Sequence, residues 1–293
     1  MATKYKIDGA SSGLVELHAP DLYLPDEIAV PLSSLNELDD TALALYHHSG
    51  YLAIENVFSQ EEVDAAREGL AHLVSGGNPD YDDIYYERFA AERLDDLSLD
   101  DRIDAVRKLA YYVEFDARLK ALSHHPRILG VVSRLLGGHE PWMFQDMGML
   151  KPPGGREKPW HQDKAYFDFP VDTPVVGVWV ALDPVGPENG CMFVMKGAHK
   201  LGPVIHFNRR DWQICDTDVK QLRNGSQLPS VAVPLQPGGC LFFDGLLPHG
   251  TPTNQTNLRR RALQFHYAPS ETQKVPTEDR MALFGSEGKN VSC

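Results

Sequence analysis

The run WMFQDMGMLK at residues 142–151 opens the part of the chain that decides the fold. Six more short runs follow it, each apolar or alternating between apolar and polar residues, and clusters of Pro, Gly, Asn and Asp separate them. Several short runs bounded by turn residues at close intervals are typical of a β-sandwich or a β-barrel. The six further runs are residues 174–182, 191–196, 203–207, 231–235, 239–244 and 261–268.

The residues before this region show helical patterns instead. A helical pattern begins near Asp39, and SQEE at 59–62 is a capping box followed by apolar residues at helical spacing. Residues 51–57, which lie between these two helices, are expected to form a short strand. Two further helices are predicted, one over 101–123 and one from Pro126, a favoured first helical residue, to the glycine pair at 137–138.

We expect one domain over residues 1–293, because nothing linker-like separates the helical part from the strand-rich part. Its fold class is α+β or mainly β, with helices that buttress a β-barrel. Residues 1–38 are read as an irregular N-terminal arm and 269–293 as a C-terminal tail. The acidic and aromatic segment 76–104 is either a lid over a pocket or a solvated surface insertion, and the sequence leaves both open.

Composition excludes several classes of protein. The 293 residues are 42% hydrophobic and 24% charged, and the formal net charge is -13. A general nucleic-acid binder or a protein of anionic membrane surfaces needs a positive field, so neither partner is expected. Four cysteines without a CxxC pair, no apolar signal core and no long apolar stretch predict a soluble cytoplasmic protein with reduced thiols. No pattern indicates the oligomeric state.

The stretch WHQD at 160–163 carries a candidate metal site. His161 and Asp163 lie two residues apart, so in an extended segment both side chains face the same way. A third candidate, His249, follows 88 residues later in LPHG. Two histidines and one carboxylate form the facial triad of non-haem Fe(II) oxygenases, which leaves positions open for a co-substrate and O2. If His249 is not the distal ligand, His266 or His199 is the next candidate.

Three adjacent arginines begin the run RRRALQFHY at 259–267. Strand alternation places Arg260 on one face with Ala262, Gln264 and His266, and Arg259 and Arg261 on the other. A buried guanidinium needs an anionic partner, and a dicarboxylate co-substrate would supply one. The alternative is a basic surface strand, which is the preferred interpretation for Arg259 and Arg261.

Basic residues near these motifs have two interpretations. They could line the approach of an anionic substrate, or they could be solvated surface charges, and the second interpretation is preferred. The acidic segment at 80–104 could instead attract a cation. The basic residues concerned are Lys151, Arg156, Lys158, Lys164, Arg209 and Arg210.

Eight stretches, in order, resemble the phytanoyl-CoA dioxygenase family of Fe(II)/2-oxoglutarate oxygenases. Together they span about residues 45 to 268. GAHK departs mildly from the family's usual Gly-Ser-His. The stretches are GYLAIENVF (50–58), LKPPG (150–154), WHQD (160–163), WVALD (179–183), ENGCM (188–192), GAHK (197–200), PGG (237–239) and HGT (249–251).

The resemblance implies a double-stranded β-helix, that is, a jelly-roll or cupin-like core, with iron ligands His161, Asp163 and His249. It assigns the 2-oxoglutarate arginine, eleven residues after the distal histidine, to Arg260, and a tryptophan beside the co-substrate to Trp179.

The implied activity is that of a dioxygenase that uses Fe(II), 2-oxoglutarate and O2, with ascorbate as support. It would hydroxylate an unactivated C–H bond of a small organic molecule and release succinate and CO2. Desaturation or epimerisation by the same centre stays open, as does a cupin-like metal-dependent isomerase.

Overall fold

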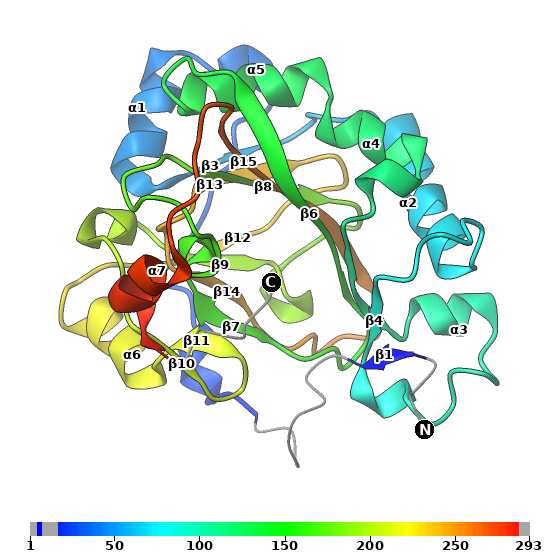
Figure 1. The fold of residues 1–293 in the computed structure, drawn as a ribbon. Helices are drawn as coiled ribbons and strands as arrows, with labels where there is room; N and C mark the ends of the chain where they lie inside the picture. Colours follow the sequence, from blue (N-terminus) through cyan, green and yellow to red (C-terminus); the bar gives the residue numbers. More distant parts are fainter. Residues whose placement is uncertain (1–4, 8–16, 287–293) are drawn as a thin grey trace.

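A computed structural model describes residues 5–7 and 17–286 of the chain. Within these residues, an eight-stranded sheet in the order β1-β4-β5-β6-β15-β8-β13-β3 faces a five-stranded sheet in the order β2-β12-β9-β14-β7 (Figure 1). The strands of the large sheet are β1 Lys6–Ile7, β3 Tyr51–Ile54, β4 Ile84–Tyr86, β5 Val106–Ala110, β6 Pro141–Lys151, β8 Val176–Ala181, β13 Cys240–Asp244 and β15 Arg260–Pro269. Those of the small sheet are β2 Glu27–Ile28, β7 Lys158–His161, β9 Met192–Met195, β12 Ser230–Val233 and β14 His249–Thr251. The hairpin β10 His206–Asn208 and β11 Trp212–Ile214 forms a separate two-stranded sheet.

The large sheet is apolar on both faces, and each face belongs to a different core. Alternation along β15 sends Leu263 and Phe265 to the core beneath the helices, while Ala262 packs in the core between the sheets. On β8, Val178 and Val180 face the helices and Trp179 faces the small sheet. This two-layer arrangement is a double-stranded β-helix, the predicted fold class.

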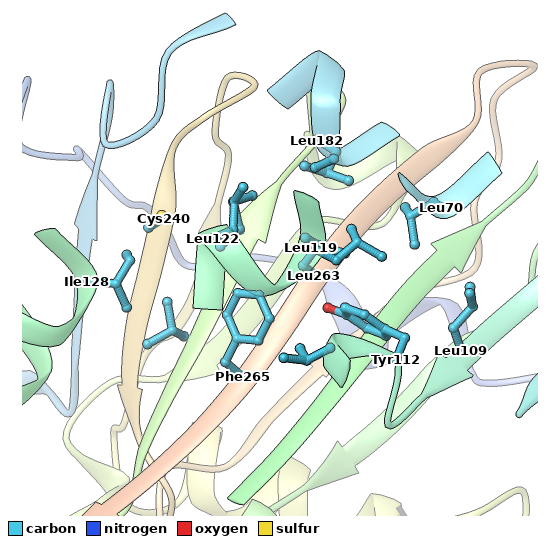
Figure 2. Close-up of a cluster of buried hydrophobic side chains, with 14 of the residues drawn as sticks. Leu70, Leu109, Tyr112, Leu119, Leu122, Ile128, Leu182, Cys240, Leu263 and Phe265 are labelled. Carbon is cyan, nitrogen blue, oxygen red and sulfur yellow. The ribbon is translucent and has the colours of Figure 1, made fainter. Parts of the chain in front are cut away.

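Helices cover the outer face of the large sheet. Figure 2 shows Leu119 and Leu122 of one of them close to Leu263 and Phe265 of β15. Two others lie beside the hairpin: α6 follows β11 directly, and Phe284 of α7 packs on His206 and Trp212 of the hairpin. The helices are α1 Asp40–Ser49, α2 Gln60–Val74, α3 Leu99–Ile103, α4 Ala117–Ser123, α5 Pro126–Leu135, α6 Asp216–Asn224 and α7 Thr277–Phe284.

Several sequence predictions of helices are confirmed in detail. Asp39 caps α1 through the backbone N–H of Ala42. Ser59 and Glu62 form the predicted capping box of α2. Helix α5 begins at Pro126 as expected. These ends are set by local hydrogen bonds, which is why sequence alone could find them.

The predicted helix over 101–123 is wrong. Residues 106–110 form β5, which pairs with β4 on one side and β6 on the other, and helix resumes only in α4. The apolar positions Val106 and Leu109 fit a helical spacing, but both are buried in the sheet core. Pairing with β6, which is distant in sequence, outweighs the local helical preference.

Three segments are more ordered than the sequence suggested: the N-terminal arm, residues 76–104 and the C-terminal tail. In the arm, η1 Pro20–Tyr23 buries Tyr23 between the sheets, and β2 pairs with β12. Within 76–104, β4 is a strand of the large sheet, so the segment is built into the core at this point. The predicted tail contains α7. None of the described helices has the length and apolar character that crossing a membrane requires.

Candidate metal centre

Three side chains, two from paired strands and one from a short helix, meet between the sheets. His161 ends β7, Asp163 begins the short helix η5 Asp163–Tyr166, and His249 begins β14. His161 and His249 are direct cross-strand partners, and their ring centroids lie 4.3 Å apart. The register of β7 and β14 therefore brings together two residues that are far apart in sequence.

The potential ligand atoms of these residues lie within 4.8 Å of one another, and all three side chains are buried. Asp163 Oδ1 is 3.4 Å from His161 Nε2 and 3.5 Å from His249 Nε2. One cation with bonds of about 2.1 Å could touch all three atoms.

Backbone carbonyls fix both histidine rings. His161 Nδ1 lies 2.7 Å from Pro159 O, and His249 Nδ1 lies 2.9 Å from Leu247 O. Because a carbonyl only accepts, each Nδ1 carries the proton and each Nε2 offers a lone pair. Burial, with His249 close by, lowers the pKa of His161 to about 4, so its ring is neutral near pH 7.

The two oxygens of Asp163 have different surroundings. Oδ2 lies 2.7 Å from His266 Nε2 and 3.4 Å from Gln264 Nε2. Oδ1 is buried and has no hydrogen-bond partner among the described residues. A buried carboxylate oxygen without a partner is costly, and a metal ion would remove that cost. The residues present therefore fit a divalent metal ion.

Arg260 faces the same space, whereas its two neighbours face away. It is buried, its Nη1 donates to Met149 O at 2.9 Å, and its Nε has no partner within the described residues. Its guanidinium carbon lies 5.4 Å from the centre of the Trp179 ring. Burial lowers the pKa of Arg260 to about 10, which still leaves it charged at neutral pH. Arg259 pairs with Asp104 and Arg261 pairs with Asp183.

One pocket of about 690 Å³, including its open side, connects these groups. Its wall includes the three candidate ligands, Arg260 and Trp179, together with residues that the sequence analysis had not assigned to a site. Those residues are Arg107, Lys108, Met147, Met149, Met192, Asp211, Gly250 and Thr251. Arg107 and Lys108 were hidden because their segment was read as a helix, and no sequence signal marked the methionines.

The preferred reading of the nearby basic residues as solvated surface charges is wrong for most of them. Lys164 is buried and donates to backbone carbonyls, including Val171 O at 2.6 Å. Lys151 is buried behind Thr251, with Nζ 2.8 Å from Thr251 Oγ1, and burial lowers its pKa well below the usual range. Lys158 is partly buried, lines the pocket and pairs with Asp211.

The remaining basic residues lie outside the pocket wall. The side chain of Arg210 is buried against Glu157 and Asp216. Arg156 is largely covered, and of these six residues only Arg209 is an exposed charge.

The two histidines named as alternatives to His249 for the distal ligand do not join His161 and Asp163 as His249 does. His266 lies behind Asp163, and His199 is half-buried away from the pocket wall, with Nε2 3.2 Å from His47 O.

Similarity to known proteins shows which family the chain belongs to. A family model described as phytanoyl-CoA dioxygenase matches residues 46–262. The chain belongs to the phytanoyl-CoA dioxygenase family. Mouse peroxisomal phytanoyl-CoA dioxygenase is 28% identical over 88% of this chain and 76% of its own length. Methylphosphonate hydroxylase of Gimesia maris is 27% identical over 78% and 80%.

Solved structures share the fold of this chain. EctD from S. alaskensis superimposes with a TM-score of 0.67 over 90% of this chain and 88% of its own, at 21% identity. EvdO2 from Micromonospora carbonacea gives 0.63 over 86% and 99%, at 25% identity. The family and the jelly-roll fold identify the chain as a non-haem 2-oxoglutarate-dependent dioxygenase.

Proposed function

We propose that the protein binds Fe(II) through His161, Asp163 and His249 and uses 2-oxoglutarate and O2 to hydroxylate a small organic molecule. The observation that carries this proposal is the convergence of two imidazole Nε2 atoms on an unpartnered, buried Asp163 Oδ1. Two histidines and one carboxylate leave part of an octahedral ion open for other ligands. When bound, the iron supplies the oxidising power that no side chain in the pocket can supply.

Arg260 supplies the second half of the proposal, because it would hold the far carboxylate of 2-oxoglutarate. Its Nε is buried and unpartnered among described residues, and its fork geometry suits a carboxylate. Thr251 Oγ1 accepts from Lys151, so its own proton is available toward the pocket that Thr251 lines. Trp179 would form the wall against which the co-substrate lies.

Other outcomes at the same centre remain the second candidate. A solved structure with this fold, SnoN, is an α-ketoglutarate-dependent epimerase, with a TM-score of 0.65 and 22% identity. Epimerisation and desaturation make the same demands on the protein ligands as hydroxylation does. A metal-dependent isomerase would not consume 2-oxoglutarate, so measurement of succinate separates it from both.

The test is production of succinate from 2-oxoglutarate by purified protein with Fe(II) and ascorbate. Turnover should need both metal and O2, and a metabolite screen by mass spectrometry should find a product that gains one oxygen. His161→Ala, Asp163→Ala and His249→Ala should each abolish turnover and weaken Fe(II) binding with little loss of fold. Near-normal activity and iron content in His249→Ala would remove His249 from the proposal.

For the compartment, we propose the cytoplasm. Three cysteines are free thiols in the described part of the chain, and two of them, Cys191 and Cys240, are buried. Free thiols fit a reducing environment.

A further inference from the structure

His266 is a fully buried histidine that the proposed chemistry does not use. It lies on the face of β15 that also carries Arg260 and Gln264, since alternate residues of a strand share a face. Its Nε2 is 2.7 Å from Asp163 Oδ2, the oxygen turned away from the two candidate histidine ligands. One strand thus carries both the candidate co-substrate arginine and a contact to the candidate carboxylate ligand.

The short contact defines which ring nitrogen donates. A carboxylate only accepts, so His266 Nε2–H donates to Asp163 Oδ2. The side-chain amide of Gln264 lies beside the same ring nitrogen, 3.1 Å away. Nδ1, the other ring nitrogen, is buried and has no hydrogen-bond partner among the described residues. A buried polar atom without a partner is unfavourable, so a ring kept in this place calls for a compensating role.

Aromatic side chains surround the ring on several sides. The ring of Phe167 lies 5.0 Å from that of His266, and Phe144 and Phe243 lie at 6.0 and 6.5 Å. These apolar neighbours exclude water, which strengthens the hydrogen bond to Asp163 Oδ2. Gln264 Nε2, at 3.4 Å, is a second and longer contact to the same oxygen.

We propose that His266 is a positioning residue that makes Asp163 a one-oxygen ligand. By holding Oδ2, it turns Oδ1 alone toward the metal. If both carboxylate oxygens were bound, one more coordination position would be lost to 2-oxoglutarate and O2. This inference rests on the proposed metal site, and it goes further by assigning the geometry of that site to a residue that is not a ligand.

The experiment compares His266→Leu, which removes the donor at similar bulk, with His266→Gln, which keeps an N–H donor. Phe167→Leu is the matched control, because Phe167 packs on the His266 ring, its side chain has no hydrogen-bonding group to offer Asp163, and leucine keeps this side of the ring apolar. Fe(II) and Mn(II) dissociation constants are measured without turnover, together with the visible absorption of the anaerobic Fe(II)·2-oxoglutarate complex and the thermal midpoint of each apo-protein.

We expect His266→Leu to weaken metal binding about 10- to 100-fold, the usual effect of losing an outer partner of a ligand. The absorption band of its 2-oxoglutarate complex should shift or weaken. His266→Gln should recover metal affinity to within about 5-fold of the wild type, and Phe167→Leu should stay within about 3-fold, allowing for the context dependence of such contacts.

Two results would overturn the proposal. One is a His266→Leu variant with the metal affinity and absorption band of the wild type. The other is equal loss of metal affinity in His266→Gln, His266→Leu and Phe167→Leu with parallel falls in thermal midpoint, which would make His266 a packing residue. Failure of the proposed function looks different, because the wild-type protein itself would then bind no Fe(II) and show no absorption band.

Discussion

At the scale of single residues, the site depends on short-range contacts that orient each side chain before any metal arrives. Both candidate histidine ligands donate Nδ1–H to the carbonyl two residues earlier, Pro159 for His161 and Leu247 for His249. His206 repeats the pattern with Val204. The local backbone therefore sets the tautomer, and the metal-binding nitrogen is exposed at no further conformational cost.

Arg260 is the residue whose substitution should separate co-substrate binding from metal binding. Arg260→Ala would leave the far carboxylate of 2-oxoglutarate without a partner, and loss of one partner of a buried charged pair costs about 2–5 kcal/mol. We expect the KM for 2-oxoglutarate to rise roughly 30-fold or more, at about 1.4 kcal/mol per decade. Arg260→Lys should raise this KM less than Arg260→Ala does. Fe(II) affinity should hardly change in either variant.

Arg259→Ala and Arg261→Ala are the controls, because both arginines face away from the pocket. Each should keep the KM for 2-oxoglutarate within a few-fold of the wild type. Arg261→Ala should still lower stability by about 1–3 kcal/mol, since Arg261 makes charged hydrogen bonds to Asp183 of 2.9 and 2.7 Å. A large KM effect in Arg261→Ala with a mild one in Arg260→Ala would mean that the assigned face of β15 is wrong.

At the scale of elements, β8 and β13 shape the wall behind the distal histidine. A Cβ atom at Gly177 of β8 would lie 2.3 Å from Phe243 Cζ. The Phe243 ring on β13 is buried and lies 4.7 Å from the ring of His249. Gly177 therefore makes the space in which Phe243 supports His249.

Gly177→Ala should force Phe243 toward His249 and so disturb both packing and the metal site. Overpacking of this kind costs about 1–3 kcal/mol. We expect a lower thermal midpoint together with weaker Fe(II) binding, measured by calorimetry and metal titration. Adding Phe243→Leu to Gly177→Ala should restore part of both losses. If Gly177→Ala keeps the thermal midpoint and Fe(II) affinity of the wild type, the Phe243 ring can adopt another position without disturbing His249.

At the scale of the whole molecule, the fold should not depend on its metal. One hydrophobic core lies beneath the helices and another lies between the sheets, and each is built from many buried side chains. Removal of the metal by a chelator should leave the far-ultraviolet circular dichroism unchanged. It should lower stability only by the binding term, about 2.7 kcal/mol when free metal had been at a hundred times Kd. Loss of secondary structure on chelation would contradict this.

The free energy of unfolding should fall as the pH falls, because the protein buries neutral histidines. Burial lowers the pKa of His206 to about 3. Between pH 3 and the ordinary value near 6.5 the unfolded chain binds a proton that the folded chain does not, so acid favours unfolding. The stability contributed by neutral His206 is complete above pH 6.5 and is lost as pH falls toward 3, by up to about 1.4 kcal/mol per pH unit.

His206→Gln tests this, because a glutamine can accept from Gln162 N and donate to Val204 O as His206 does. Denaturant unfolding of the apo-protein at pH 4.5, 5.5 and 7 should show a shallower loss of stability in the variant. Part of the slope should remain, because burial also lowers the pKa of His161 to about 4. Identical slopes in the two proteins would show that His206 does not contribute.

The sequence by itself determined the features that depend on near neighbours. The caps of α1 and α2, the start of α5 and most strands of the second half follow from hydrogen bonds and alternation within a few residues. The family motifs could also be recognised in the sequence, because they are short runs of residues in a fixed order. Alternation along β15 was enough to put Arg260 and Arg261 on opposite faces.

Tertiary structure decided whatever depends on partners far away in the chain. Strand β5 forms where the sequence indicated a helix, because β4 and β6 supply its hydrogen bonds. Lys151 is buried because the distant Thr251 hydroxyl and the carbonyls of Thr251 and Pro252 accept its hydrogen bonds, and composition carries no trace of those acceptors. The same holds for His266, whose sequence position suggested a spare metal ligand. Only the tertiary structure brings its ring to Oδ2 of Asp163, which lies far away in the sequence.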